Sequence, residues 1–250
     1  MIILKSREEI EILRKANQIV AEILYSLVEE IRPGMTSEDL DRMAEEKILE
    51  RGGSPAFKGY RGYPATLCAS VNEGIIHGVP NHRKFQEGDI VSLDLGVLCQ
   101  GYYGDSALSL AVGMVNPEKK HLLQVTQEAL WKGIEQGRSG NRLGDISHAV
   151  QTHVERNGFS VVREFVGHGI GKDLHEEPQI PNYGEPHQGP RLREGMVLCI
   201  EPMVNAGGSE VEILEDGWTA VTADRSPSAH FEHTIVITNG EPEILTLVKQ

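Results

Sequence analysis

Residues 87–105 read EGDIVSLDLGVLCQGYYGD, and this stretch predicts the centre of the fold. Apolar and β-branched residues fill most positions from 90 to 98 and again from 102 to 111. Between these two runs lie Gln100 and Gly101, which are typical of a tight turn. The stretch therefore predicts a hairpin whose first strand is buried.

Each arm of this hairpin carries one carboxylate, Asp94 and Asp105. The sum of the two numbers is odd, as it is for residues opposed across a two- or four-residue loop, so we expect both on one face. Neighbouring carboxylates repel each other, and burying an ionised carboxylate among apolar residues is costly unless something compensates it. A bound cation would remove both costs. Alternatively, one aspartate is protonated, or a different register keeps the two apart.

The size of the chain permits a full hydrophobic core, as one large domain or as two fused halves, because 39% of its 250 residues are hydrophobic. The formal net charge of −13 argues against nucleic acid or an anionic membrane as the main partner. Either partner would need a clustered basic surface, so we expect no specific nucleic-acid binding.

Targeting signals are weak in this sequence. Too few apolar residues precede the first charges for a signal peptide, and no apolar run approaches the length of about 20 residues that a membrane span needs. The three cysteines, Cys68, Cys99 and Cys199, fit neither an even disulfide framework nor a CxxC metal motif. We therefore expect a cytoplasmic protein without a membrane partner.

Cap residues and apolar residues at helical spacing predict four helices. We expect them from Ser6 to the Pro33-Gly34 pair, from about Thr36 to Gly52-Gly53, from Asn116 to about Gly137, and from Asp145 to Asn157. In the turn-rich segment after the second helix, we expect one short strand at residues 66–70 and otherwise loop.

The two halves of the chain repeat each other. The segment EGDIVSLD at 87–94 matches EGMVLCIE at 194–201, with an offset of 107. An offset of 106 relates Gly34, Asp39-Leu40, Ala44, Ile48 and Gly52 to Gly140, Asp145-Ile146, Val150, Val154 and Gly158. Two matches at nearly one offset are not expected by chance. The sequence thus predicts one α+β domain, 1–250, whose homologous halves, about 6–112 and 116–240, pack around a pseudo-two-fold axis.

Three further residues lie in settings that suit a metal site. Glu201 ends the apolar strand VLCIE, as Asp94 lies at the end of its repeat. In SAHFEHTIVIT, interpreted as one strand, alternation places Glu232 on the same face as polar residues including His230. His168 stands between glycines, which leave room for its imidazole to project into a cavity. Taken singly, Glu201 could be a cap, Glu232 a surface strand residue, and His168 a loop histidine.

Several segments of the chain resemble the signatures of type I methionine aminopeptidases. They are HGIGKDLHEEP, SLDLG followed by GYYGDSA, IEPM and FEHTIVIT, and the similarity covers essentially the whole sequence. The resemblance implies the pita-bread (creatinase/aminopeptidase) fold, in which two pseudo-symmetric halves form a single catalytic domain of antiparallel sheet covered by helices. It also implies two divalent metal ions, Co, Mn, Fe or Zn, held by Asp94, Asp105, His168, Glu201 and Glu232.

The implied activity is hydrolytic removal of the N-terminal methionine from peptides and nascent chains, with a preference for small second residues. Metal ions would lower the pKa of water towards about 7 and so supply a nucleophile. By the resemblance, Glu201 would carry the proton, His77 would contact the substrate near the scissile amide, and His175 would donate to the oxyanion. Taken without the resemblance, the two histidines are better explained by hydrogen bonds that stabilise loops.

A methionine pocket needs apolar walls, and aromatic edges suit a thioether sulfur. The resemblance assigns the substrate-binding positions to Tyr60, Tyr63, Cys68, His77, Leu174, His175 and Trp218. The aromatic residues could equally belong to the core. Phe57 and Leu174 depart from some relatives, which carry a smaller residue and an aromatic residue there, and the depth of the pocket is therefore open.

The chain resembles the short bacterial form of these enzymes. Its first helix is expected near residue 6, and the 30 residues between Glu201 and Glu232 leave no room for the helical insertion of type II enzymes. Prolidases and Xaa-Pro aminopeptidases usually carry an additional N-terminal domain, creatinase-like members lack metal, and non-catalytic binding or scaffold proteins lose ligands. The five intact positions favour the aminopeptidase. The resemblance implies action near the ribosome, and we expect a monomer.

Overall fold

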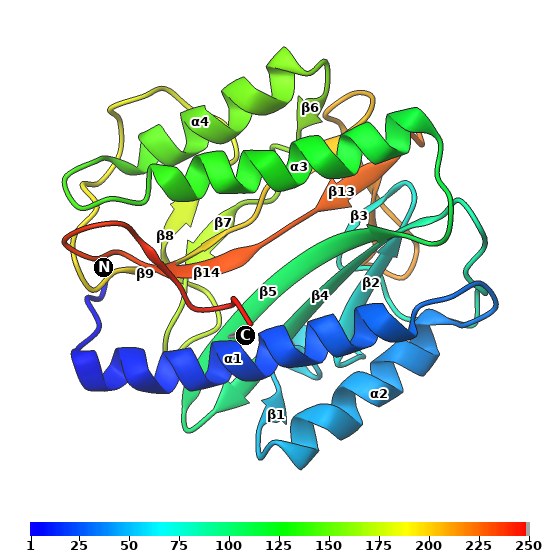
Figure 1. The fold of residues 1–250 in the computed structure, drawn as a ribbon, viewed down its shortest axis with the longest axis horizontal. Helices are drawn as coiled ribbons and strands as arrows, with labels where there is room; N and C mark the ends of the chain where they lie inside the picture. The colour runs from blue at the N-terminus through cyan, green and yellow to red at the C-terminus, as the bar shows by residue number, and fades with distance from the viewer. Residues whose placement is uncertain (249–250) are drawn as a thin grey trace.

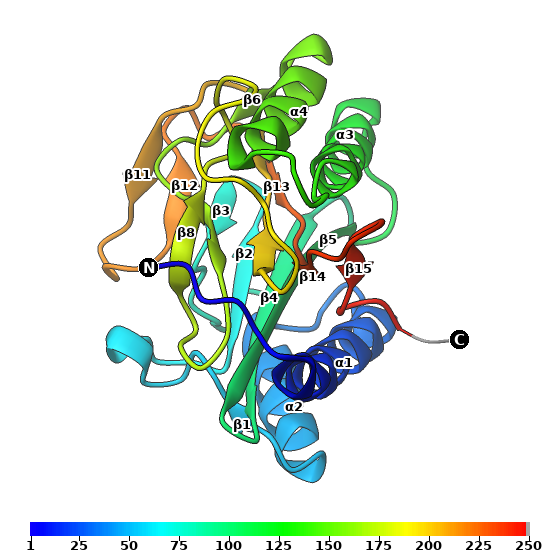
Figure 2. The ribbon, with the colours of Figure 1, turned by 90° about the vertical axis from the view of Figure 1, so that its left-hand side faces the viewer.

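The computed structural model describes residues 1–248, in which two pairs of helices cover curved antiparallel sheets (Figure 1). The helices are α1 (Arg7–Glu30), α2 (Ser37–Glu50), α3 (Pro117–Glu135) and α4 (Leu143–Arg156). Figure 2 shows α1 and α2 at one end of the molecule and α3 and α4 at the other, with the strands between them. The helices therefore bury their apolar faces against the sheets from two opposite sides.

Two larger sheets form the centre of the molecule. The first contains β1 (Ser54–Pro55), β2 (Leu67–Val71), β4 (Ile90–Cys99) and β5 (Tyr102–Ala111). The second contains β7 (Gly167–Gly169), β8 (Glu176–Ile180), β9 (Val197–Ile200), β14 (His233–Val236) and β15 (Glu243–Ile244). Two smaller sheets consist of β3 (Gly74–Ile76), β11 (Val211–Ile213) and β12 (Ala220–Thr222), and of β6 (Ser160–Val161), β10 (Met203–Asn205) and β13 (Ser228–His230).

The predicted hairpin is β4 and β5, joined by the turn at Gln100 and Gly101. Its register places Asp94 opposite Ala107 and Asp105 opposite Gly96. The two aspartates therefore share one face, as the parity argument predicts, but they are diagonal neighbours rather than direct cross-strand partners. Gly104 lets β5 approach α1 closely, because a Cβ at this position would lie 2.7 Å from the backbone of Ala16.

The helix starts follow the predicted capping chemistry. Ser6 and Glu9 form the capping box of α1, and Asn116 accepts a hydrogen bond from the N–H of Lys119 at the start of α3. The predicted start of α4 at Asp145 is wrong, because Asp145 is the third residue of the helix and accepts from the N–H of Arg142. An acid that suits a cap also suits the first turn.

Two strand predictions were also wrong. β3 lies in the segment expected to be loop; it is three residues long, and its partner β12 lies more than 140 residues further along the chain. SAHFEHTIVIT is not one strand but two, β13 and β14, which belong to different sheets. At the break, the N–H of Phe231 donates to Pro202 O and that of Glu232 to Ala107 O.

Local features of the backbone recur at the offsets found in the sequence. Gly34 and Gly140 adopt left-handed φ values of 94° and 97°. The N–H of Gly34 donates to Phe85 O at 2.9 Å, and that of Gly140 donates to Leu192 O at 3.0 Å. β4 and β9, the repeated strands, each have partners on both edges. These recurrences support our proposal of one domain built from two related halves.

Candidate metal centre and substrate pocket

A cavity of about 370 Å³ opens beside the two larger sheets. It is lined by every residue that the sequence analysis assigned to the site: Tyr60, Tyr63, Cys68, His77, Asp94, Asp105, His168, Leu174, His175, Glu201, Trp218 and Glu232. Phe57 lines it too. The cavity is also lined by Arg61, Glu164 and Gln179, which no motif in the sequence indicated. Residues from both halves of the chain therefore meet around one space.

Four carboxylates converge at one end of this cavity. Asp94 and Asp105 project from the middle of β4 and β5. Glu201 directly follows β9, and Glu232 directly precedes β14, so each of these acids lies where the chain leaves a sheet. All four are less than one tenth exposed. The apolar strands around them bury the acids as a group.

Burial is the main cause that raises the pKa of each of these carboxyl groups. Neighbouring charges raise these pKa values further. The charges of Glu232 and Asp94 raise the pKa of Asp105, and the charge of Asp94 raises that of Glu201. Within residues 1–248, none of the four acids forms an ion pair with a lysine or an arginine. Without a cation, the group must take up protons to lower its mutual repulsion.

Several oxygens of this cluster lack any hydrogen-bond donor in the described part of the chain. They are Oδ1 of Asp94, Oδ1 of Asp105 and Oε1 of Glu232. A buried polar atom without a partner is costly, and such atoms are uncommon in folded proteins. Carboxylate oxygens in this condition are suitable ligands for a divalent cation, which would satisfy their lone pairs and offset their charge.

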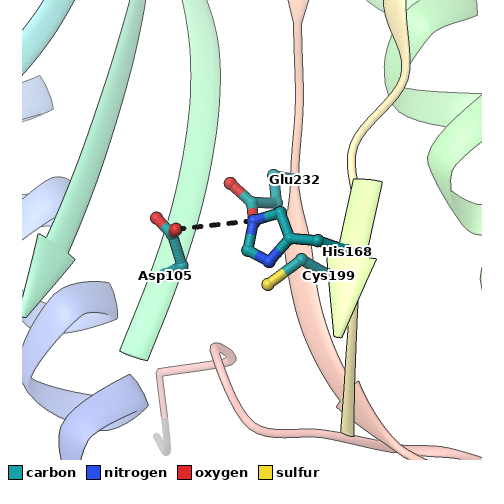
Figure 3. A group of neighbouring side chains, drawn as sticks. All are labelled: Asp105, His168, Cys199 and Glu232. Carbon is teal, nitrogen blue, oxygen red and sulfur yellow. Dashed lines mark ion pairs between the residues drawn. The ribbon is translucent and has the colours of Figure 1, made fainter. Parts of the chain in front are cut away.

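The imidazole of His168 is also oriented to bind a cation. Its Nδ1 lies 2.9 Å from Gly169 O, so Nδ1 carries the hydrogen and donates it to the carbonyl. Its Nε2 then presents a lone pair to Asp105 Oδ2 at 3.9 Å (Figure 3) and to Glu201 Oε1 at 3.5 Å. Burial lowers the pKa of His168 to about 3, so the ring is neutral. A lone pair facing carboxylates indicates a site for a cation.

Cys199 lies closer to this site than the sequence suggested. One ligand atom from each of Asp105, His168, Cys199 and Glu232 lies within 4.8 Å of the others (Figure 3). Burial and then the charge of Glu232 raise the pKa of the Cys199 thiol well above its usual value, and its sulfur contacts Thr234 Oγ1 at 3.3 Å. Because the thiolate is the form that binds metals, we assign Cys199 to packing.

His230 is a second neighbour of the acids. Its Nε2 is buried without a hydrogen-bond partner, and it lies 3.9 Å from Glu201 Oε2. The strand alternation had placed this histidine on the face of Glu232, although the two residues lie on either side of a break between sheets. Burial lowers the pKa of His230 to about 3, so it adds a neutral polar wall to the cluster.

His175 and His77 line the cavity beside the acids. Nδ1 of His175 lies 2.9 Å from the hydroxyl of Tyr60, and its ring centroid is 4.4 Å from that of His168. Burial lowers the pKa of His175 and of His77 to about 4 each. His77 adopts a left-handed φ of 58° and packs edge-on against Phe165. Both rings are therefore neutral and held in defined positions.

Much of the remaining cavity wall is apolar and aromatic. The ring of Tyr63 packs edge-on against Trp218, with centroids 5.2 Å apart. The hydroxyl of Tyr63 donates to the carbonyls of Leu67 and Gly78, which fixes the ring. Cys68 lies opposite Asp94 in the sheet register, so this apolar wall begins directly beside the acids.

Comparison with known proteins agrees with this arrangement. The model of a family described as metallopeptidase family M24 matches residues 11–239. The chain belongs to metallopeptidase family M24. This membership confirms the predicted fold class, α+β with the pita-bread arrangement, and the resemblance found in the sequence.

Individual relatives are similar to this chain over their full length. The methionine aminopeptidase of Clostridium perfringens is 53% identical, with all of both chains covered, and methionine aminopeptidase 1 of Bacillus subtilis is 52% identical, with 99% of this chain and 100% of the relative covered. The crystal structure of methionine aminopeptidase from Thermotoga maritima has a TM-score of 0.97 at 50% identity, covering 98% of this chain and 99% of that one.

A second group of similar structures is more distant. The prolidase from Pyrococcus horikoshii has a TM-score of 0.81 at 26% identity, and the match covers 99% of this chain but 64% of the prolidase. The prolidase therefore shares the fold, whereas the full-length agreement is with the methionine aminopeptidases. No helix among the described residues combines the length and the apolar character that crossing a membrane requires.

Proposed function

We propose that this chain is a metal-dependent aminopeptidase that removes N-terminal methionine from peptides and nascent proteins. The observation that carries the proposal is the buried cluster of four carboxylates and a neutral imidazole, with unpartnered oxygens, directly beside an aromatic pocket. Relatives named methionine aminopeptidase at about half identity support the same activity. The preference for small second residues is part of the proposal.

The metal ligands in this proposal are Asp94, Asp105, His168, Glu201 and Glu232. Four ionised carboxylates carry a charge that two divalent ions would offset, so we propose two ions for each chain, of Mn, Fe, Co or Zn. Oxygen ligands with one imidazole suit all of these ions, and their order of affinity does not choose among them. When bound, the ions would polarise the scissile carbonyl and lower the pKa of water.

Glu201 is proposed to carry the proton. Burial and the charge of Asp94 raise the pKa of its carboxyl, so it binds a proton more readily than an exposed glutamate does. It would accept a proton from the attacking water and give it to the amine that leaves. His77, neutral and held against Phe165, would contact the substrate backbone near the scissile amide.

His175 is proposed to donate a hydrogen bond to the oxyanion that forms in the reaction. A neutral imidazole has one donor and one acceptor nitrogen. We propose that the hydroxyl of Tyr60, which lies 2.9 Å from Nδ1, is the donor in this hydrogen bond. Nε2 of His175 then carries the hydrogen and is the donor available to the substrate. Tyr60 would thus set the tautomer of His175 as well as form part of the pocket wall.

The methionine side chain is proposed to occupy the apolar part of the cavity. Tyr63 and Trp218 present ring edges and faces there, and Cys68 and Leu174 complete the wall. Sulfur near aromatic rings is favoured by about 0.3–1.5 kcal/mol for each contact. A straight thioether side chain would fill this space with its amino end directed to the carboxylates.

We further propose that the protein acts as a monomer in the cytoplasm, on nascent chains near the ribosome. This follows the resemblance to short bacterial relatives. Gel filtration and co-sedimentation with ribosomes would test the two parts separately. A stable dimer would contradict the first part, and the absence of co-sedimentation at low salt would contradict the second.

The activity is tested by assaying Met-Ala-Ser and a peptide with proline at its second position and a residue other than methionine at its first. We expect methionine release from Met-Ala-Ser, its loss after chelation, and its recovery with Mn²⁺ or Co²⁺. Hydrolysis of the proline peptide alone would indicate a prolidase. Tight peptide binding without turnover in any metal would indicate a scaffold.

A further inference from the structure

A buried ion pair lies beside the loop that carries His175. This loop, residues 170–175, joins β7 to β8, and Glu176 is the first residue of β8. Oε1 of Glu176 accepts a hydrogen bond from the N–H of Lys172 at 2.9 Å. Oε2 of Glu176 lies 2.5 Å from Nζ of Lys5, in the segment before α1.

The burial of this pair is unusual within the molecule. The side chains of Lys5 and Glu176 are 3% and 8% exposed. Among ion pairs of lysine or arginine with acids in residues 1–248, no other has both side chains below one tenth exposed. Removing either member of a buried ion pair destabilises the fold, because the other charge is left buried without compensation. Such a pair fixes the segments that carry its members.

The loop rests directly on the pair at Gly171. A Cβ at this position would lie 2.3 Å from Glu176 Oε1 and 2.4 Å from Lys5 Nζ. The carbonyl of Gly171 accepts from the N–H of Tyr103 on β5, and the N–H of Lys5 donates to Gly195 O. The Gly171 carbonyl therefore ties the loop to the hairpin that carries Asp105, and the pair ties the loop, through Lys5, to the turn before β9.

We propose that Lys5 and Glu176 form a charge clamp that positions His175 for the reaction. The proposal rests on the function proposed above, in which His175 is the oxyanion donor. His175 and Glu176 are adjacent in the chain, so the placement of the Glu176 carboxylate fixes the backbone from which the imidazole projects. Tyr60 fixes the imidazole ring of His175, and the clamp fixes the backbone of the same residue. Both residues act through His175 and do not touch the substrate.

The test is a double-mutant cycle between the clamp and His175. Lys5→Met should lower kcat about 10- to 100-fold, the range expected for a misplaced catalytic group, with a smaller change in KM. In a His175→Ala background, Lys5→Met should lower kcat by less than about twofold more, because the group it positions is already absent. The double variant K5M/E176Q, which removes both charges, should recover part of the kcat lost in Lys5→Met.

Two controls accompany the cycle. Lys132→Met breaks the exposed pair with Glu135 on α3 and should leave kcat unchanged. Metal content, measured for each variant, should equal that of the unmodified protein. If Lys5→Met does not fold, Gly171→Ala keeps both charges but crowds the pair, and it should give the same non-additive loss of kcat with His175→Ala.

Equal losses of kcat with and without His175 would overturn the clamp, as would a folded Lys5→Met variant with unchanged kcat. The imidazole ¹⁵N signals of His175 give a second readout that needs no turnover. They should shift in Lys5→Met and remain in place in Lys132→Met. Absence of methionine release by the unmodified protein would refute the proposed function, and unshifted signals would refute the clamp.

Discussion

Replacing Asp94 with asparagine should stabilise the metal-free protein and abolish its turnover. Asp94 is buried, its Oδ1 has no hydrogen-bond donor, and burial raises the pKa of its carboxyl from 3.8 to about 7. A carboxyl whose pKa is raised by folding binds its proton more tightly in the folded state. Its ionisation above pH 4 therefore opposes folding, increasingly so up to about pH 7.

The magnitude follows from the size of this shift. One pKa unit corresponds to about 1.4 kcal/mol. The rise from 3.8 to about 7 spans roughly three units, so ionised Asp94 costs the metal-free protein about 4 kcal/mol at pH 7. The amide of asparagine must still be accommodated among buried acids, so we expect about half of this gain, roughly 2 kcal/mol. For a chain of this length, that raises Tm by about 4–8 °C.

The assay is thermal unfolding in chelator at pH 7.5 and at pH 5. Ionised Asp94 opposes folding more at pH 7.5 than at pH 5, so Asp94→Asn should raise Tm more at pH 7.5 than at pH 5. Asp224→Asn is the control of opposite sign, because hydrogen bonds from Ser226 and Gly208 lower the pKa of Asp224 to about 2. Its stabilisation is present at both pH values and is lost only between about pH 4 and 2, so Asp224→Asn should lower Tm at both. A lower Tm for Asp94→Asn in chelator would refute the reasoning.

Four further outcomes are expected. Asp105→Asn should abolish methionine release, while Tm in chelator holds or rises; a large drop would reveal a stabilising partner of this aspartate. His175→Ala should lower kcat about 10²- to 10³-fold, as loss of one oxyanion donor does, and a normal kcat would remove it from the mechanism. Tyr60→Phe should lower kcat about 10-fold with little change in KM, since only the hydroxyl that orients His175 is lost; a change confined to KM would make Tyr60 a wall residue alone. Gly104→Ala should lower Tm by several degrees, because its Cβ would lie 2.7 Å from the backbone of α1, and an unchanged Tm would mean that α1 can move freely.

Local chemistry in the sequence predicted much of the fold. Capping boxes and the turn at Gln100 and Gly101 act over a few residues, and the helices and the central hairpin formed accordingly. The internal repeat extends the prediction further, because it relates Asp94 to Glu201 in the other half of the chain. Structure that depends on distant partners was missed. β3 pairs with β12 across the molecule, and the break at Phe231 depends on Pro202 and Ala107.

The candidate site shows the same division. Each acid could be recognised as a charge at the end of, or within, an apolar strand, and the resemblance to a family grouped the acids with the histidines. Cys199 and His230 lie beside the acids because separate strands meet there, which spacing alone does not show. The pairing of Lys5 with Glu176 spans 171 residues, and both side chains are buried. Such contacts depend on tertiary packing and leave no periodic signal.

The most direct test of the account is a calorimetric titration of the metal-free protein with Mn²⁺ or Co²⁺ at pH 7, in buffers of different ionisation enthalpy. This measurement gives both the number of ions bound and the number of protons released for each chain. The account predicts two ions and the release of at least one proton, because burial raises the pKa of the carboxyl groups that the ions neutralise. Binding of no ion, or binding without any proton release, would contradict it.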